Sequence, residues 1–185
     1  IEPRIRQAIP SSATANAPVG RCWQLPVCYG NEIAACGPDL AELATACGLP
    51  PAEVVRLHAG GSYEVCMLGF LPGFAFLGGL SERLSRPRRS QPRLRVAAGS
   101  VATAGTLTAI YPCESPGGWH LIGVCPVPLF SAAWLPPALF RPGDQVRFRA
   151  VGAAEYHALA ARMAARPAVA PPPVEFLVDE RFSGR

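Results

Sequence analysis

Alternating hydrophobic and polar residues mark several short segments of the chain as β-strands with one buried face. The predicted strands are Arg21–Tyr29, Ser62–Phe70, Val96–Ala104, Leu107–Tyr111, Trp119–Cys125 and Gln145–Val151. Turns that contain glycine or proline separate the last five strands, and no long helix lies between them. This order favours an antiparallel or mixed barrel over a sheet of βαβ units, so we expect a mainly β fold.

Helical spacing of hydrophobic residues appears in three places. Positions 40, 43, 44 and 47 are hydrophobic after Pro38 and Asp39, and Gly48 ends the run. Proline and aspartate are typical of a first helical turn, and glycine of a helix end. Further helices are predicted at Pro51–Gly60 and Ala153–Arg166. The barrel should therefore carry a small helical hairpin and a C-terminal helix.

Both ends of the chain differ in composition from this middle part. Residues 1–20 end in the small and polar SSATANAPVG, and residues 167–185 begin with the proline-rich PAVAPPP. Such segments are typical of linkers. We expect one main domain at residues 21–166 and a proline-rich tail at 167–185, whose part from Val174 to Arg185 has three interpretations: a strand, a linker to another domain or a disordered segment.

The composition limits the function classes. Half of the 185 residues are hydrophobic and only 16% are charged, so the chain has enough apolar surface to fold. All 17 basic residues are arginine. Without lysine, the chain alone can be neither a Walker-type phosphate-loop protein, nor a Schiff-base enzyme, nor a biotin carrier.

The cysteines and the long uncharged segments bear on location. Seven cysteines form no C-x-x-C pair and no cluster with histidine, which indicates reduced thiols and argues against zinc. Val65–Leu80 and Trp119–Phe140 lack charge but are too short or too rich in proline to span a membrane as helices. The N-terminal IEPRIRQAIP has no signal-peptide core. We expect a cytoplasmic protein, cut from a longer chain.

The net charge of +4 is concentrated in one segment. Residues 81–95 contain six arginines and one acid, Glu82, whereas the rest of the chain sums to −1. The segment contains no aromatic residue, which argues against nucleic-acid binding. Arginine presents forked donors to carboxylate or phosphate. Two interpretations stay open, a site for a small anion or acidic partner and a solvated turn.

Glycine is dense in three segments, residues 68–80, 97–105 and 111–123. Glycine lets a backbone approach a ligand, and it equally serves the tight bends of a barrel, so both interpretations remain. No G-x-S-x-G, H-E-x-x-H or paired-carboxylate motif occurs. The sequence therefore predicts no self-contained hydrolase site.

Several linked motifs carry a resemblance to one family. In chain order they are YEVCMLGFLPGFAFLGGL (63–80), RPRRSQPRLRVAAGSVATAG (86–105), IYPCESPGGWHLIG (110–123) and RPGDQVRF (141–148). Together with His58 they resemble the KipI / allophanate hydrolase subunit 1 family, also called the B subunit of 5-oxoprolinase, with carboxyltransferase subdomains C and D. The resemblance covers about residues 21–157. It implies a cyclophilin-like β-barrel, and it implies that residues 1–20 are the remnant of a preceding small α+β domain.

The resemblance also implies an activity. Such a chain is a non-autonomous subunit of an ATP-dependent 5-oxoprolinase-like complex, which converts 5-oxoproline to glutamate. Its implied partners are a KipA / allophanate hydrolase subunit 2-type protein and a lactam-utilisation subunit. ATP would act through the complex, with no metal or covalent cofactor on this chain. Two alternatives stay open: a KipI-like regulatory protein that inhibits a histidine kinase, and a subunit of a urea- or allophanate-type carboxyltransferase or amidohydrolase.

We expect the arginine-rich segment and the glycine-rich turns to border a site shared between subunits. The predicted site residues are Arg88, Arg89, Arg93, Ser100 and Thr106 for substrate or anion binding, and His58, Tyr111 and Glu114 for catalysis. His58, which matches the family's histidine before the YEV strand, is the candidate proton carrier. Each residue also has a structural interpretation, as a helix-face, barrel or turn residue.

Four positions depart from the family's pattern. Relatives read G-x-Q-T-G-I-Y-P and I-G-R-T-P where this chain reads GTLTAIYP and IGVCP. Leu107 and Ala109 thus replace an amide and a glycine, and Val124 and Cys125 replace an arginine and a hydroxyl. If these turns line the ligand site, several hydrogen bonds are lost, each worth about 0.5 to 3 kcal/mol.

Overall fold

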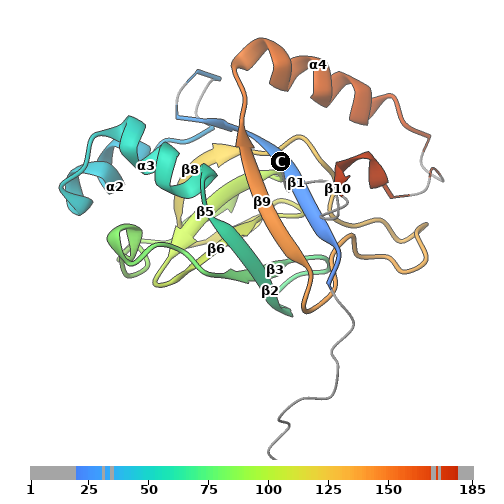
Figure 1. The fold of residues 1–185 in the computed structure, drawn as a ribbon, viewed down its shortest axis with the longest axis horizontal. Coiled ribbons are helices and arrows are strands. Elements are labelled where there is room, and N and C mark those ends of the chain that lie inside the picture. Colours follow the sequence, from blue (N-terminus) through green and yellow to red (C-terminus); the bar gives the residue numbers. More distant parts are fainter. Residues whose placement is uncertain (1–19, 31, 34–35, 168–169, 171, 179–185) are drawn as a thin grey trace, which may run out of the picture.

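The computed structural model describes residues 20–178 apart from 31, 34–35, 168–169 and 171. Its strands are β1 (Cys22–Tyr29), β2 (Ser62–Leu68), β3 (Ala75–Gly78), β4 (Arg93–Val96), β5 (Ser100–Ala104), β6 (Leu107–Ile110), β7 (Ser115–Gly117), β8 (His120–Val124), β9 (Gln145–Ala150) and β10 (Leu177–Val178). Seven of them form a closed barrel in the order β1-β8-β5-β6-β3-β2-β9 (Figure 1). The expected mainly β barrel is confirmed.

The barrel closes between its first and last strands. β1 and β9 run parallel, with Cys22 opposite Gln145 and Val27 opposite Ala150. The other pairings in the barrel are antiparallel. Closure pairs these strands with one another and so protects them from pairing with another chain.

Among the described residues, three α-helices accompany the barrel, and Figure 1 shows their arrangement. α2 (Leu40–Cys47) and α3 (Pro51–Ala59) form the predicted hairpin beside β8 and β9, and α4 (Ala153–Ala164) follows β9. Gly48 ends α2 in the left-handed conformation and donates its N–H to the helix's last carbonyls, as the sequence predicted. No helix among the described residues is long and apolar enough to cross a membrane.

The segment predicted as one strand at Val96–Ala104 contains the last residue of β4, a turn and the whole of β5. Gly99, at a φ of +81°, turns the chain between β4 and β5, and a Cβ there would lie 2.5 Å from the carbonyl oxygen of Cys125. β4 leaves the barrel and pairs with β7 in a separate two-stranded ribbon. The predicted start of the strand was wrong because residues 96–98 are all apolar and no polar residue marks the turn before Gly99.

β5 is buried on both faces because it separates two hydrophobic cores. Val101 faces the barrel interior with Ile110 and Ile122. Ala102 faces an outer core that the ribbon covers; its buried members are Phe74, Val96, Ala102, Ala104, Ala109, Tyr111, Trp119 and Leu121. This outer core is the place where a candidate site lies.

The structure describes the two ends of the chain to different extents. The expected domain remnant at 1–20 lies almost entirely outside the described residues. In the tail, Phe176 is buried in the barrel core, and β10 pairs with the start of β1 through Val178 and Leu177. The described part of the tail therefore matches the strand interpretation.

Candidate functional site

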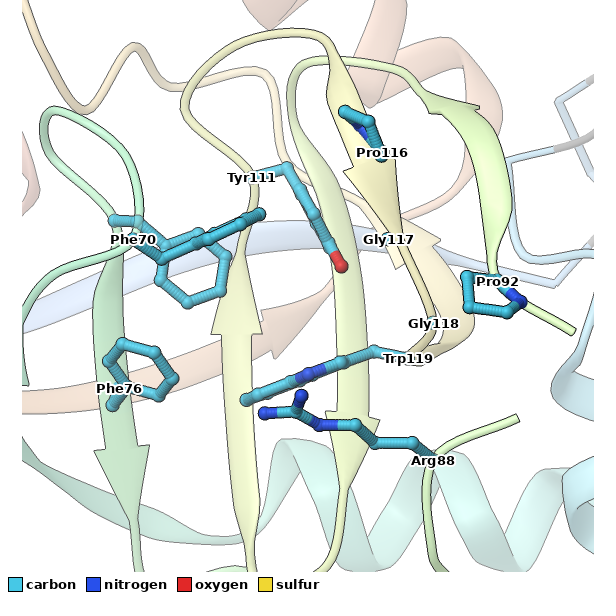
Figure 2. Close-up of a pocket in the computed structure, with 10 residues that line it drawn as sticks. Phe70, Phe76, Arg88, Pro92, Tyr111, Pro116, Gly117, Gly118 and Trp119 are labelled. Carbon is cyan, nitrogen blue, oxygen red and sulfur yellow. The ribbon is translucent and has the colours of Figure 1, made fainter. Parts of the chain in front are cut away.

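A cavity of about 300 Å³ opens beside the outer core. Figure 2 shows the side chains that surround it. The lining residues are Phe70, Phe74, Phe76, Arg88, Pro92, Tyr111, Pro116, Gly117, Gly118 and Trp119. They come from β3 and the loop before it, the arginine-rich segment, the residue directly after β6, and β7 with the turn to β8. The cavity thus brings together the arginine-rich segment and two of the three glycine-dense segments.

Phe74 is the centre of the aromatic wall. Its ring meets the rings of Phe70, Phe76, Tyr111 and Trp119 edge-on, at centroid distances of 5.4, 5.0, 5.4 and 5.9 Å. Edge-to-face packing is the favoured arrangement of aromatic rings and holds each ring in a defined orientation. The cavity therefore has rigid, apolar walls that suit a planar or compact apolar ligand group.

Phe70 forms an exposed part of this wall. It is 64% exposed and adopts a φ of +70°, the left-handed region that residues other than glycine rarely enter. Such a conformation costs about 1 to 3 kcal/mol and persists only where the surrounding structure enforces it. It places a large aromatic ring at the rim instead of in the core.

Arg88 supplies the positive charge of the cavity. Its guanidinium carbon lies 5.9 Å from the centroid of the Trp119 ring, a cation–π distance. The side chain extends along that ring in Figure 2. Arg88 makes no ion pair with any described residue. Its donors are therefore available to an anionic group in the cavity.

Arg89 and Arg93 are engaged elsewhere, although the sequence groups them with Arg88. Arg89 donates Nη1 to Asp39 and to Glu42, at 2.9 Å each. Arg93 donates Nη1 and Nη2 to the two oxygens of Asp39, at 2.8 and 2.6 Å. The structure therefore places only one of the three predicted anion-binding arginines in the cavity.

Tyr111 presents a hydroxyl to the cavity, and that hydroxyl points toward Trp119 (Figure 2). Burial raises the pKa of the phenol, while the charges of Arg88 and Arg93 act to lower it. The phenol therefore stays protonated at neutral pH and is a hydrogen-bond donor. Gly117 makes room for it, because a Cβ at that position would overlap the hydroxyl oxygen.

His58 does not line the cavity. It is fully buried in the barrel, stacked on Phe148 at a centroid distance of 4.7 Å. The hydroxyl of Thr108 donates to the carbonyl of Ala102. The same hydroxyl oxygen therefore accepts a hydrogen bond from Nε2–H of His58, at 2.8 Å. The other ring nitrogen, Nδ1, accepts the hydroxyl of Tyr29 at 2.7 Å. Burial lowers the pKa of His58 to about 3. Its surroundings therefore hold a neutral ring in place.

The other predicted site residues lie apart from the cavity lining. Glu114 pairs with Arg95 on the exposed ribbon, at 2.9 and 3.0 Å. Ser100 is buried at the start of β5, and Thr106 lies exposed in the β5–β6 turn. The positions that depart from the family pattern, Leu107, Ala109, Val124 and Cys125, do not line the cavity either.

Sequence reasoning missed the aromatic lining. The signal was present, because positions 70, 74 and 76 carry phenylalanine within the glycine-dense segment 68–80. Their convergence on Tyr111 and Trp119 depends on the pairing of β3 with β6, which the sequence pattern does not give. Among the described residues, no group of three or more metal-ligating side chains is assembled.

Comparison with known proteins places the chain in a family. Residues 1–140 match the model of the family described as carboxyltransferase domain, subdomain C and D. The chain belongs to this family.

The B subunit of 5-oxoprolinase from Bacillus subtilis (strain 168) is 50% identical over 138 residues, which are 75% of this chain and 56% of that protein. The protein of the same name from Haemophilus influenzae (strain ATCC 51907 / DSM 11121 / KW20 / Rd) is 44% identical over 129 residues, 70% of this chain and 59% of that protein. This member of the family thus spans somewhat over half the length of the curated relatives it matches.

Solved structures agree with the barrel. A conserved uncharacterized protein from Pyrococcus horikoshii superposes with a TM-score of 0.69 at 44% identity, covering 74% of this chain and 62% of that one. The Kluyveromyces lactis urea carboxylase gives 0.67 at 21% identity, covering 78% of this chain and 15% of that one. The second likeness concerns the fold alone.

Proposed function

We propose that this chain is part of a subunit of an ATP-dependent 5-oxoprolinase complex, which opens 5-oxoproline to glutamate and is inactive without a KipA / allophanate hydrolase subunit 2-type partner. Relatives that are named as the B subunit of 5-oxoprolinase, 44 to 51% identical, support the subunit type. The observation that carries the proposal further is the cavity, where Arg88, which forms no ion pair within the described part of the chain, lies beside a phenol donor and an aromatic wall.

The chemistry of 5-oxoproline fits these groups. The molecule is a compact five-membered ring with one carboxylate and one lactam carbonyl. Arg88 pairs with the carboxylate, the rings of Phe74 and Trp119 flank the apolar ring atoms, and Tyr111 donates a hydrogen bond to the lactam oxygen. A donor at that oxygen stabilises the negative charge that develops there when the carbonyl carbon is attacked. The roles of this chain are thus binding, orientation and stabilisation of the charge that develops at the lactam oxygen.

The nucleotide belongs to another part of the complex. The chain contains no lysine, and Arg89 and Arg93 are neutralised by carboxylates. A single uncompensated arginine matches a monoanion better than a triphosphate, which phosphate sites usually meet with several cations or backbone amides. We therefore assign no ATP-binding step to the described residues.

Reconstitution of the full-length protein with its partner subunits tests the proposal. We expect ATP-dependent glutamate release from 5-oxoproline only when every subunit is present. Arg88→Ala should raise KM for 5-oxoproline about tenfold or more, because a charge-assisted hydrogen bond is lost. Tyr111→Phe should lower kcat more than it changes KM. Turnover by this subunit alone, or wild-type KM in Arg88→Ala, would contradict the proposal.

A regulatory function is the second candidate, and the exposed rim favours it. Phe70 is 64% exposed and Met67 is 52% exposed, which suits an apolar contact with another protein. If this chain inhibits a histidine kinase, Phe70→Ala should abolish binding to the kinase. Loss of glutamate release with intact kinase binding in the same variant would instead favour the enzyme subunit.

A further inference from the structure

Asp39 is the most heavily hydrogen-bonded carboxylate near the cavity. It lies directly before α2 and is only 2% exposed. Besides Arg89 and Arg93, it accepts the backbone N–H of Leu121 in β8, through Oδ2 at 2.8 Å. One buried carboxylate thus joins three segments that are far apart in the sequence: the start of α2, the arginine-rich segment and β8.

Further hydrogen bonds hold the backbone on both sides of Arg88. Immediately before it, the carbonyl of Pro87 accepts Nε2–H of His120, at 2.9 Å. Immediately after it, the N–H of Arg89 donates to the carbonyl of Gly118, at 2.8 Å. The segment that carries Arg88 is therefore fastened to the two neighbours of Trp119, the ring along which Arg88 extends.

The side chain of Arg89 adds the longer-range link. Its guanidinium is held by Asp39, which is itself held by Leu121, two residues beyond Trp119. Arg93 fastens the other end of the same segment to the same carboxylate. Asp39 therefore closes a ring of contacts that runs through β8 and both sides of Arg88.

Asp39 also sets the charge at the cavity. Arg93 is close enough to Tyr111 to act, like Arg88, on the pKa of its phenol. Asp39 pairs with both Arg93 and Arg89, and Glu42 pairs with Arg89 as well, so two carboxylates balance these two arginines and leave Arg88 as the single uncompensated cation among the described residues there. Without Asp39, Glu42 alone would face two arginines beside Arg88, and the like charges would repel one another within one short segment.

We propose that Asp39 is a positioning residue for Arg88: acting through Arg89 and Arg93, it holds the guanidinium of Arg88 against Trp119 and keeps the cavity monocationic. The kinetic consequence rests on the function proposed above, whereas the geometric one does not. Asp39 does not line the cavity itself, so its effect on ligand binding must pass through Arg88.

Nuclear magnetic resonance of the full chain tests the geometry without any ligand. In the wild type, the ring current of Trp119 should shift the side-chain protons of Arg88 upfield, and the amide of Arg89 should exchange slowly with solvent. Asp39→Asn should remove the shift and speed the exchange. Arg89→Gln, which changes a partly exposed side chain and breaks the same link, should do the same if Asp39→Asn does not fold.

Asp144→Asn is the matched control. Asp144 is also buried, at 3% exposure, and accepts the N–H groups of Arg21, Arg141 and the Trp23 indole. None of these partners lines the cavity. This variant should lose stability yet keep the Arg88 shift. An unchanged Arg88 shift in both Asp39→Asn and Arg89→Gln, or an equal loss in Asp144→Asn, overturns the inference.

A double-mutant cycle in the assembled complex tests the kinetic consequence. Asp39→Asn should raise KM for 5-oxoproline about tenfold with a smaller change in kcat, and it should add nothing in the Arg88→Ala background. If the increases in KM caused by the two single substitutions multiply in the double variant, the positioning role is overturned. If Arg88→Ala leaves KM unchanged while Asp39→Asn still removes the Arg88 shift, the positioning inference stands and the proposed ligand site fails.

Discussion

His58, the candidate proton carrier, is part of a buried hydrogen-bonded network in the barrel. Its two ring nitrogens are satisfied by Tyr29 and Thr108, its carbonyl accepts the hydroxyl of Tyr63 at 2.7 Å, and Phe148 covers one face. A buried polar network of this kind stabilises one arrangement of the core, because any lost partner leaves an unsatisfied group. The consequence of this arrangement is a histidine that resists protonation.

Because His58 stays neutral in the folded protein, we expect the free energy of unfolding to fall in acid. The pKa of His58 in the folded state, about 3, lies below its ordinary value of 6.5. Between these two pH values the histidine is protonated in the unfolded chain and neutral in the folded chain. The contribution of His58 to stability is complete above 6.5 and is lost as the pH falls toward 3. Over that window we expect a loss of about 1.4 kcal/mol per pH unit.

Urea unfolding at a series of pH values measures this loss. His58→Gln should be less stable than the wild type at neutral pH, by about 2 to 4 kcal/mol, because two buried hydrogen bonds are disturbed. It should also show a shallower loss on acidification. His157→Gln, on the exposed side of α4, is the control and should follow the wild type. Parallel pH profiles for wild type and His58→Gln would show that His58 titrates normally.

At the scale of elements, the β4–β7 ribbon forms the outer wall of the cavity. β7 carries Gly117, whose missing Cβ leaves the space that the Tyr111 hydroxyl fills. Gly118 is different, since a Cβ there would meet only Pro92 at 3.6 Å and the carbonyl oxygen of Arg89 at 3.8 Å, which are ordinary contacts. A side chain is therefore excluded at Gly117 but can be accommodated at Gly118.

Gly117→Ala should displace the ring of Tyr111 and destabilise the protein by about 1 to 3 kcal/mol, as overpacking does. Gly118→Ala should cost much less. Thermal unfolding of the two variants measures the difference, and near-ultraviolet circular dichroism follows the aromatic wall. Equal melting temperatures for both variants would mean that the ribbon moves freely away from Tyr111.

The elements also show what a sequence pattern can predict. α2 and α3 were predictable because their spacing, proline starts and glycine ends are local signals. β3 was not, because its four residues lie in a glycine-dense segment, and both its hairpin partner β2 and its second partner β6 are fixed only by the folded barrel. For the site, Arg88 and Tyr111 were predicted from sequence, but the pairing of Arg89 and Arg93 with Asp39, 50 and 54 residues away, was not. Such contacts depend on the folded barrel.

At the scale of the molecule, the tail covers part of an edge of β1 that the closed barrel leaves unpaired. β1 pairs with β9 along one edge, but on the other edge it reaches β8 only at Cys28 and Tyr29. β10 covers the first part of that edge, and the preceding Phe176 inserts into the core at 8% exposure. The tail thus protects an edge that would otherwise be open to intermolecular pairing.

Phe176→Ala should therefore destabilise the whole barrel, by about 3 to 4 kcal/mol, since a buried aromatic ring is removed from the main core. Val174→Ala, two residues earlier and 56% exposed, should change stability by less than about 0.5 kcal/mol. Urea unfolding of both variants gives the comparison. Hydrogen exchange at Trp23 locates the effect, because the amides of β1 opposite β10 should lose protection only in Phe176→Ala. If both variants unfold like the wild type, the tail lies on the barrel without stabilising it, and the main domain ends at α4.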